Sequence, residues 1–377
     1  MTERYGKLPS RDESFAACRS ALSDSLQIST DRALLAHGDS LALCKAMPDD
    51  SVSLILTDPP YHSTKKANIV GDKAFQEDVD FIRWMANYAE EWKRILRPNG
   101  TIYLFCSSQM SARLEVAFSK FFRPIAHITW TKPNLPGYDG WKGKMKKEAL
   151  RSWYPHSERI LVFEHGGYGN WEAYRRSPLG EFLREMRLQS GMSMNALAEV
   201  TGAYGRVNHG GAVANWEAGR NIPNAEQYAK ICEAIEGTGR VDSMPPYEDV
   251  VRPMFLNGNI EFTDVWNFPS VKPFKGKHPA EKPQDMLQHI VRASSYPGDV
   301  VLDCFAGSGS TGVAALTLDR RSIAMEIEEK WIERAASDFE FLERSAEQKS
   351  NGPRPEEAGS DESPAGLNGS DHDEVLF

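Results

Sequence analysis

The sequence predicts a doubly wound α/β fold with a mostly parallel sheet and an all-helical insert. Short apolar runs at 53–56, 101–106 and 300–303 are typical of strands that are buried on both faces. Between such runs, apolar residues recur at helical spacing, as they do from Phe81 to Ile95. This alternation predicts a parallel sheet with helices on both faces. Residues 178–237 break the alternation and have only helical periodicity.

Length and composition set the scale of the protein. Its 377 residues, 41% of them hydrophobic, can bury a large core and leave room for an inserted domain. The formal net charge of −9 argues against a simple basic surface for nucleic acid, but residues 351–377 hold seven acidic side chains against the single Arg354. We predict that the tail over 345–377 is disordered, because it is rich in glycine, serine, proline and acidic residues.

Cysteine usage and hydropathy indicate the compartment. The five cysteines have no spacing typical of a metal site, and we interpret them as reduced thiols. We find neither a signal peptide nor an apolar run that could span a bilayer. The sequence therefore predicts a soluble cytoplasmic protein with no metal site and no membrane partner.

The first core strand ends at a turn with an acidic residue. Residues 34–36 are apolar, His37-Gly38-Asp39 follows them, and a helix is predicted over 40–46. Asp39 is well placed to be the N-cap of that helix. Residues 1–31, which precede this strand, are predicted to lie at the edge of the domain.

The strand over 53–56 runs into Asp58-Pro59-Pro60-Tyr61. Each proline forces the residue before it into an extended backbone, so the turn is stiff. An acidic group and an aromatic ring are thus held just past the carboxyl edge of the sheet, where ligands bind in open α/β folds. Alone, the motif is equally compatible with a proline-rich strand exit that has no chemistry.

The next elements continue the α/β pattern. The helix over 81–95 is predicted to end at Arg97-Pro98-Asn99-Gly100, before the strand over 101–106. A helix over 110–118 and strands over 125–130 and 159–163 follow.

Basic and aromatic residues alternate between the last two strands, a pattern that suits a nucleic-acid backbone with splayed bases. The alternative is a solvated loop. The basic residues are Lys132, Lys142, Lys144, Lys146 and Lys147, and the aromatic ones are Tyr138, Trp141, Trp153 and Tyr154.

A second ligand-binding pattern lies near the end of the chain. The strand over 300–303 leads into the glycine-rich segment 304–312 and then a helix, a geometry that lets a nucleotide-like ligand approach the backbone. The following strand, 322–325, ends at Glu326, where a carboxylate can accept ribose hydroxyls.

These motifs resemble those of the S-adenosylmethionine-dependent DNA amino-methyltransferases. Asp58-Pro59-Pro60-Tyr61 resembles their Asp-Pro-Pro-Tyr motif, and 303–312 resembles their Phe-x-Gly-x-Gly loop. Lys282-Pro283 resembles the Lys-Pro segment that precedes this loop. The order of the motifs matches the circularly permuted beta group of that family, and the resemblance covers roughly 32–170 and 255–340. It implies a Rossmann-like methyltransferase fold.

The resemblance assigns roles to the residues of both motifs. Asp58 and the carbonyl of Pro59 would accept the two N–H bonds of an exocyclic amine, Pro60 would stiffen the turn, and Tyr61 would stack on a flipped base. Asp39 would lie beside the adenine of the cofactor, unless it serves only as a helix cap. The cofactor-binding residues implied are Asp39, Lys282, Pro283, Asp303, Phe305, Gly307, Ser308, Gly309, Thr311 and Glu326.

The insert over 178–237 resembles a helix-turn-helix domain of the phage-repressor type. Its recognition helix would start near Ala212, and Arg206, Asn208, Ala212 and Asn215 would reach base edges. Eight basic against seven acidic residues over 175–240 make a weak phosphate-binding face. The alternative is that the insert packs on a partner subunit or braces the fold.

We therefore predict a DNA adenine-N6 methyltransferase, bacterial or phage-encoded, that uses S-adenosylmethionine and acts on double-stranded DNA. Asp before Pro-Pro-Tyr favours adenine as a family tendency; a cytosine-N4 or RNA methyltransferase is the first alternative, and a DNA-binding regulator with a vestigial core is the second. The family also includes homodimers and enzymes with a separate restriction partner. The predicted domains are 1–31, 32–177, 178–237, 238–344 and 345–377.

Overall fold

The protein is described here from a computed structural model. The structure describes residues 5, 8–61, 75, 77–133, 146–153, 156–166, 177–202, 211–256, 262–272 and 274–350. The predicted disorder of 351–377 lies outside these residues. Within them, no helix is long and apolar enough to cross a membrane.

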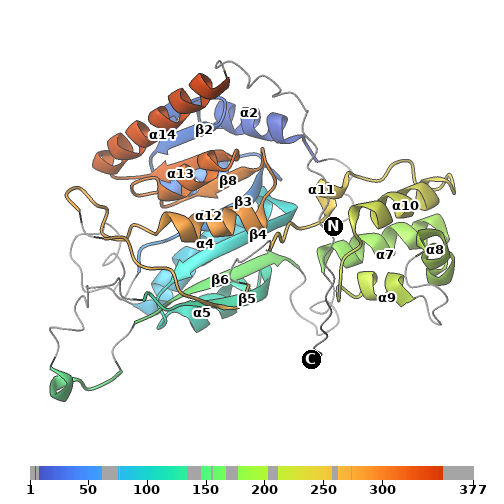
Figure 1. Ribbon diagram of the computed structural model, residues 1–377, viewed down its shortest axis with the longest axis horizontal. Helices are drawn as coiled ribbons and strands as arrows, with labels where there is room; N and C mark the ends of the chain where they lie inside the picture. The colour runs from blue at the N-terminus through green and yellow to red at the C-terminus, as the bar shows by residue number, and fades with distance from the viewer. Residues whose placement is uncertain are drawn as a thin grey trace, which may run out of the picture.

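The described chain forms a nine-stranded sheet in the order β1-β2-β9-β8-β3-β4-β6-β5-β7 (Figure 1). The strands are β1 (Leu26–Ser29), β2 (Ala33–His37), β3 (Val52–Thr57), β4 (Leu96–Cys106), β5 (Phe122–Trp130), β6 (Glu158–His165), β7 (Val265–Trp266), β8 (Val300–Asp303) and β9 (Arg321–Glu326). From β2 to β4 all neighbours are parallel, whereas β6 is antiparallel to both β4 and β5. The predicted fold class is confirmed.

Helices cover both faces of this sheet (Figure 1). All six residues of β3 are buried. Because side chains alternate along a strand, Ile55 packs with the helices on one face while Leu54 and Leu56 pack with those on the other. One face has α3 (Ser40–Ala46), α4 (Asp78–Ile95) and α5 (Ser111–Phe118); the other has α12 (Gln284–Ser294) and α13 (Ser310–Thr317).

The sheet brings the two sequence motifs to one edge. β3 and β8 are parallel neighbours, with Leu54 opposite Val301 and Ile55 opposite Leu302. Their carboxyl ends therefore lie side by side, as the doubly wound fold predicts for strands at the switch point. The predicted contact between these two strands is confirmed.

One strand boundary was predicted wrongly. β4 begins at Leu96, directly after α4, instead of at residue 101. Leu96 pairs with Val52 and Thr101 with Leu54, so residues 97–100 form a bulge in the strand rather than a turn before it. Gly100 is required in the bulge, since an added Cβ would lie 2.9 Å from the carbonyl oxygen of Ser53.

The region of the insert is helical where the structure describes it. Its helices are α7 (Pro178–Ser190), α8 (Met194–Thr201), α9 (Gly211–Glu217) and α10 (Ala225–Glu236), and they lie to one side of the sheet (Figure 1). A buried ion pair joins Arg187 of α7 to Glu217 of α9, with Nη2 and Oε2 3.0 Å apart. The apolar core of these helices also includes Tyr5, Val250 and Val251, which lie outside the predicted limits 178–237.

The bulge in β4 holds the segment that returns from the insert. Asn99 donates to the carbonyl of Glu248 at 2.8 Å, and the buried Arg97 pairs with Asp249 at 3.0 Å. Both acceptors belong to the short helix α11 (Tyr247–Val250). The bulge thus places Arg97 and Asn99 where they hold α11, and the contacts of these two side chains help to position the insert.

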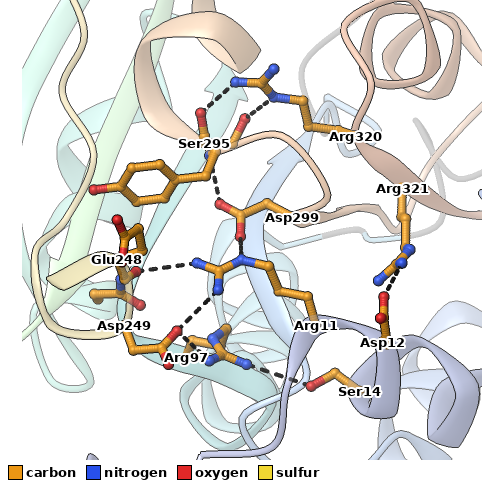
Figure 2. Close-up of polar contacts among 12 residues, drawn as sticks. Arg11, Asp12, Ser14, Arg97, Glu248, Asp249, Ser295, Asp299, Arg320 and Arg321 are labelled. Carbon is orange, nitrogen blue, oxygen red and sulfur yellow. Dashed lines mark hydrogen bonds and ion pairs between the residues drawn. The ribbon is translucent and has the colours of Figure 1, made fainter. Parts of the chain in front are cut away.

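The N-terminal segment joins the same network. Arg11, the first residue of α2 (Arg11–Ala21), lies between Asp249 and Asp299 (Figure 2). Its guanidinium is 3.1 Å from the first carboxylate and 2.6 Å from the second, which lies in the turn before β8. Residues 1–31 are predicted to lie at the domain edge; the structure shows in addition that Arg11 links α11, which follows the insert, to the turn before β8. A short 3-10 helix, η1 (Ser23–Ser25), follows α2.

The last helix, α14 (Glu329–Ser350), packs against β2 and β9 through residues such as Ala335 and Phe339. It continues to Ser350, so residues 345–350 are helical and the predicted start of the disordered tail at 345 was wrong. The remaining described element is the 3-10 helix η3 (Lys147–Ala149).

Asp249→Asn is expected to lower the free energy of unfolding by about 3 kcal/mol, because it leaves the buried Arg97 guanidinium without its carboxylate. Urea titration followed by tryptophan fluorescence measures the change. The control is Asp338→Asn, which removes a partner from an exposed pair with Arg334 and should cost less than about 0.5 kcal/mol. Equal effects of the two variants would contradict a structural role for the pair at the bulge.

Candidate active site

The candidate site lies at the carboxyl ends of β3 and β8. Thr57, the last residue of β3, donates from Oγ1 to Asp303 Oδ1 at 2.7 Å. The same hydroxyl accepts from the backbone N–H of Cys304 at 3.2 Å. These bonds join the strand that precedes Asp58 to the strand that precedes the glycine-rich loop. The turn 58–61 and the loop 303–312, which we call the two half-sites, therefore lie together.

Asp58 has one occupied and one free carboxylate oxygen. Oδ2 accepts from Lys282 Nζ, whereas Oδ1 is buried and has no hydrogen-bond partner in the described chain. Burial raises the pKa of Asp58, and the positive charge of Lys282 opposes that shift. A buried acceptor without a donor is costly, so the free oxygen indicates a place for a donor from a ligand.

Lys282 lies inside the site rather than at its border. Its ammonium contacts Asp58, is 3.7 Å from Glu158, and lies over the rings of Tyr61 and Phe105 at 5.5 and 5.0 Å from their centroids. Burial lowers the pKa of Lys282, but the two carboxylates outweigh it and raise the pKa overall. The family resemblance assigns Lys282 to the cofactor pocket, whereas in the structure its ammonium contacts Asp58, the proposed catalytic carboxylate.

Glu158 is a site residue that the sequence did not reveal. It is the first residue of β6, and it accepts from Lys132 Nζ and from the Tyr61 hydroxyl, the latter at 3.1 Å. Burial raises the pKa of Glu158, but the charges of Lys282 and Lys132 lower it overall. A lone glutamate before an apolar run has no motif of its own, so only the fold identifies it.

Lys132 was predicted to contact the DNA backbone with the other lysines of its segment. It lies two residues after the end of β5, with a positive φ of 50°, and its ammonium lies 4.7 Å from the centre of the Trp130 ring. Burial lowers the pKa of Lys132. In this structure the side chain pairs with Glu158 inside the site, and its contact with a phosphate stays a prediction.

The loop after β8 is shaped by glycines. Gly307 has a φ of 51°, and an added Cβ would lie 3.0 Å from the His278 ring. Gly309 has a φ of 80° and is followed by Ser310, the first residue of α13. Phe305 packs on Trp84 and Tyr88, with ring centres 5.6 and 5.2 Å apart. The two glycines thus let the loop turn at the sheet edge and pack closely against neighbouring side chains.

Asp303 and Glu326 hold this loop in place. Asp303 Oδ1 accepts from the backbone N–H of Phe305 at 3.1 Å, in addition to Thr57. Glu326 Oε2 accepts from the N–H of Gly307 at 2.7 Å, and its other oxygen accepts from two more backbone N–H groups. The sequence predicted Glu326 as a ribose ligand; the structure shows that both its oxygens are engaged within the protein.

The remaining predicted cofactor residues surround the loop. Ser308 donates to Glu281 at 3.4 Å, Thr311 is buried in α13, and Pro283 immediately precedes α12. Asp39 accepts from the N–H of Ala42 at 2.8 Å and is the N-cap of α3, which was the alternative weighed for it.

His278 and Trp331 flank the loop and were not predicted. Their rings meet edge to face with centres 4.5 Å apart, and Trp331 Nε1 is buried without a partner in the described chain. Burial lowers the pKa of His278 to about 4. The histidine belongs to the segment identified before the glycine-rich loop, but nothing in its sequence context indicated the ring contact.

The predicted DNA-contacting residues have mixed outcomes. Ala212 is fully buried among the insert helices, so it cannot reach a base edge and that prediction was wrong. Asn215 accepts from Arg220 at 3.2 Å on the same part of the insert. Lys146 is exposed, and the nearby Trp153 is 97% exposed. Lys142, Lys144, Arg206, Asn208 and the side chain of Lys147 lie outside the described residues.

A family model described as DNA methylase, N6_N4_Mtase, matches residues 52–337, a range that contains both half-sites. The chain belongs to this family of DNA methylases. Its two motifs, 58–61 and 303–312, are therefore parts of a DNA methyltransferase.

Relatives of this methylase include enzymes of both base types. The DNA adenine methyltransferase YhdJ of Escherichia coli (strain K12) is 27% identical over 301 residues, which cover 78% of this chain and 79% of the relative. Among solved structures, the PvuII DNA methyltransferase, described as cytosine-N4-specific, is 16% identical with a TM-score of 0.47 and covers 86% of this chain and 95% of its own. The M1.HpyAVI–SAM complex is 18% identical with a TM-score of 0.44, and the match covers 81% of this chain and 98% of the solved chain.

His278 and Asp303 are expected to affect stability in opposite directions with pH. An unfolded histidine binds its proton near pH 6.5, whereas folded His278 binds it only at about 4. Between these values the unfolded state holds more protons, so stability falls as pH falls. His278→Gln should therefore reduce the stability lost between pH 7 and pH 4.5 by about 2 kcal/mol.

For Asp303 the sign is reversed. Its burial raises the pKa to about 6 from 3.8, so the folded state binds the extra proton first and this residue adds stability as pH falls. Asp303→Asn should therefore increase the loss of stability between pH 7 and pH 4.5. Urea unfolding at the two pH values measures both variants, and a shift in the same direction for both would contradict the assignment.

Proposed function

We propose that the protein transfers a methyl group from S-adenosylmethionine to the N6 amino group of adenine in double-stranded DNA. One observation carries the proposal: the free, buried Oδ1 of Asp58 lies next to the strand that supports the glycine-rich loop. An acceptor for an amine thus stands beside a loop suited to a nucleotide-like ligand.

The residues present fit the proposed cofactor. Gly307 and Gly309 have positive φ angles that other residues rarely adopt, and they pack closely against His278 and Ala335, which fixes the loop at the end of β8. Phe305 offers an aromatic surface, and the buried Trp331 N–H is an unused donor in the described chain. When bound, S-adenosylmethionine supplies a methyl group on a positively charged sulfur. We assign its binding to Phe305, Gly307, Ser308 and Gly309, with Asp303 and Glu326 holding the loop.

Asp58 prepares the amine for attack. An exocyclic amine is a weak nucleophile because its lone pair is delocalised into the base ring. Asp58 Oδ1 and the carbonyl of Pro59 accept its two N–H bonds, which localises the lone pair on nitrogen. The stiff Pro59-Pro60 turn fixes both acceptors, so the residues act mainly through positioning and electrostatics.

Tyr61 holds the target base after it leaves the duplex. Its hydroxyl donates to Glu158 at 3.1 Å, and this hydrogen bond fixes the orientation of the Tyr61 ring after the Pro59-Pro60 turn. A base extruded from DNA can stack on such a ring, and the energy of unstacking is partly recovered there. The ring thereby sets the plane in which the amine meets Asp58.

The insert is the proposed reader of DNA sequence. Its helices α7 to α10 form a separate apolar core, and it is inserted between the two half-sites in the chain. Because Ala212 is buried, contacts to bases fall to other side chains of this region, Asn215 among them. The exposed Lys146 and Trp153 lie in a second segment that suits contact with the DNA backbone and with bases.

Asp58→Ala is expected to reduce methyl transfer to DNA about a thousandfold while leaving affinity for S-adenosylmethionine within a few-fold of wild type. The reason is that Asp58 faces the amine, whereas the cofactor is held by the loop after β8. Transfer is measured with labelled cofactor, and binding is measured by calorimetry. Asp285→Ala, an exposed change at the start of α12, is the control. Equal loss of transfer and binding in Asp58→Ala would refute this division of the site.

The choice of base has its own test. Duplex DNA modified by the wild-type protein is digested to nucleosides, and we expect N6-methyladenine because Asp precedes Pro-Pro-Tyr. N4-methylcytosine would instead support the alternative specificity. Absence of any methylated nucleoside, with S-adenosylmethionine bound, would favour a DNA-binding regulator with an inactive core.

A further inference from the structure

Asp58 belongs to a chain of largely buried charged side chains, of which Lys282, Glu158 and Lys132 have no charge role in the proposed reaction so far described. Glu158 contacts three groups: Lys132 at Oε1, and the Tyr61 hydroxyl and Lys282 at Oε2, at 3.1 and 3.7 Å. Lys282 in turn contacts Asp58. The four charged side chains have exposed fractions of 27% for Lys132, 18% for Glu158, 8% for Lys282 and 17% for Asp58.

We propose that Glu158 and Lys132 are positioning residues: Glu158 offsets the charge of Lys282 so that Asp58 can serve the reacting amine, and Lys132 keeps the four-residue cluster neutral. This inference rests on the proposed methyl transfer. Asp58 and Glu158 carry two negative charges, and Lys282 and Lys132 carry two positive ones. The four side chains together therefore have no net charge. The pair of Asp58 and Lys282 is also neutral by itself, so Glu158 and Lys132 add one further charge of each sign.

Neutrality matters because of where charge moves in the reaction. The amine nitrogen forms a bond to the methyl carbon as the carbon–sulfur bond breaks and its electron pair stays on sulfur. Positive charge thus leaves sulfur and develops on nitrogen, and the N–H proton then passes to Asp58 Oδ1 and on to water. An ammonium next to Asp58 opposes this step unless a second carboxylate offsets it.

Glu158 supplies that second carboxylate in a suitable place. Once Asp58 takes the proton, Lys282 still has a negative partner within 3.7 Å. The cluster gains one positive charge as the sulfur loses one, so the total buried charge of the site stays constant. Tyr61, which is bonded to the same oxygen of Glu158, links this balance to the position of the base.

The test uses the difference in charge between two ligands. S-adenosylmethionine has a positive sulfur, whereas S-adenosylhomocysteine has a neutral one and is otherwise nearly the same size. Glu158→Gln gives the cluster a net positive charge, so we expect affinity for S-adenosylmethionine to fall about tenfold relative to S-adenosylhomocysteine, with a further loss in transfer rate.

The double variant Glu158→Gln with Lys132→Met removes one charge of each sign and restores neutrality. We expect it to bring the ratio of the two affinities back to within about threefold of wild type. Calorimetry without DNA measures the affinities, and thermal unfolding of each apo protein reports whether it is folded.

The outcomes separate the inference from the proposed function. Equal weakening of both ligands in Glu158→Gln, or no recovery in the double variant, would show that Glu158 is merely structural and would overturn the inference. If the wild-type protein binds neither ligand, the proposed cofactor is wrong and the inference falls with it. Methylation of cytosine instead of adenine would change the proposed substrate and leave the inference intact, because the charge movement is the same for both amines.

Discussion

The ion pair between Lys282 and Asp58 joins two parts of the active site that lie 224 residues apart in the sequence. It works because β3 and β8 are neighbours, so the turn after one strand faces the segments around the other. The Thr57–Asp303 hydrogen bond fixes the same arrangement at the strand ends. Without this pairing, the acceptor for the amine and the loop for the cofactor would not share a site. The sheet order is therefore the physical basis of the proposed chemistry.

The core of the fold was predictable because burial on both faces leaves a local signal. β3 and β8 are continuous apolar runs, and the acidic and glycine-rich residues that follow them mark the sheet edge. The β4 bulge has no such local signal, because the contacts that stabilise it join Arg97 and Asn99 to a helix about 150 residues away in the sequence. Glu158 was missed for the same reason, since its three contacts come from three distant segments. Ala212 shows the converse error: the pattern identified its helix but not which face of the helix is buried.

The insert is held to the catalytic domain by more than its chain connections. Tyr5 packs on Phe182 with ring centres 4.8 Å apart, and Arg11 pairs with Asp249 and Asp299 at the turn before β8 (Figure 2). The N-terminal segment thus contacts the insert at one point and the cofactor half at another. Multiple charged contacts of low exposure favour a fixed orientation over a flexible tether. In a methyltransferase that reads DNA with the insert, this orientation would set the distance between the recognised bases and the extruded one.

The buried charges of the active site are difficult to explain by stability alone. Moving two carboxylates and two ammonium groups out of water costs several kcal/mol per ion, and apolar side chains of similar volume are often at least as stable. The free Asp58 Oδ1 adds a further cost, because no donor in the described chain compensates it. Costs of this kind are typical of sites whose groups are arranged for a ligand that brings its own donors and charge. The exocyclic amine and the sulfonium are such partners, so the charge pattern that weakens the isolated fold is the one that the proposed reaction requires.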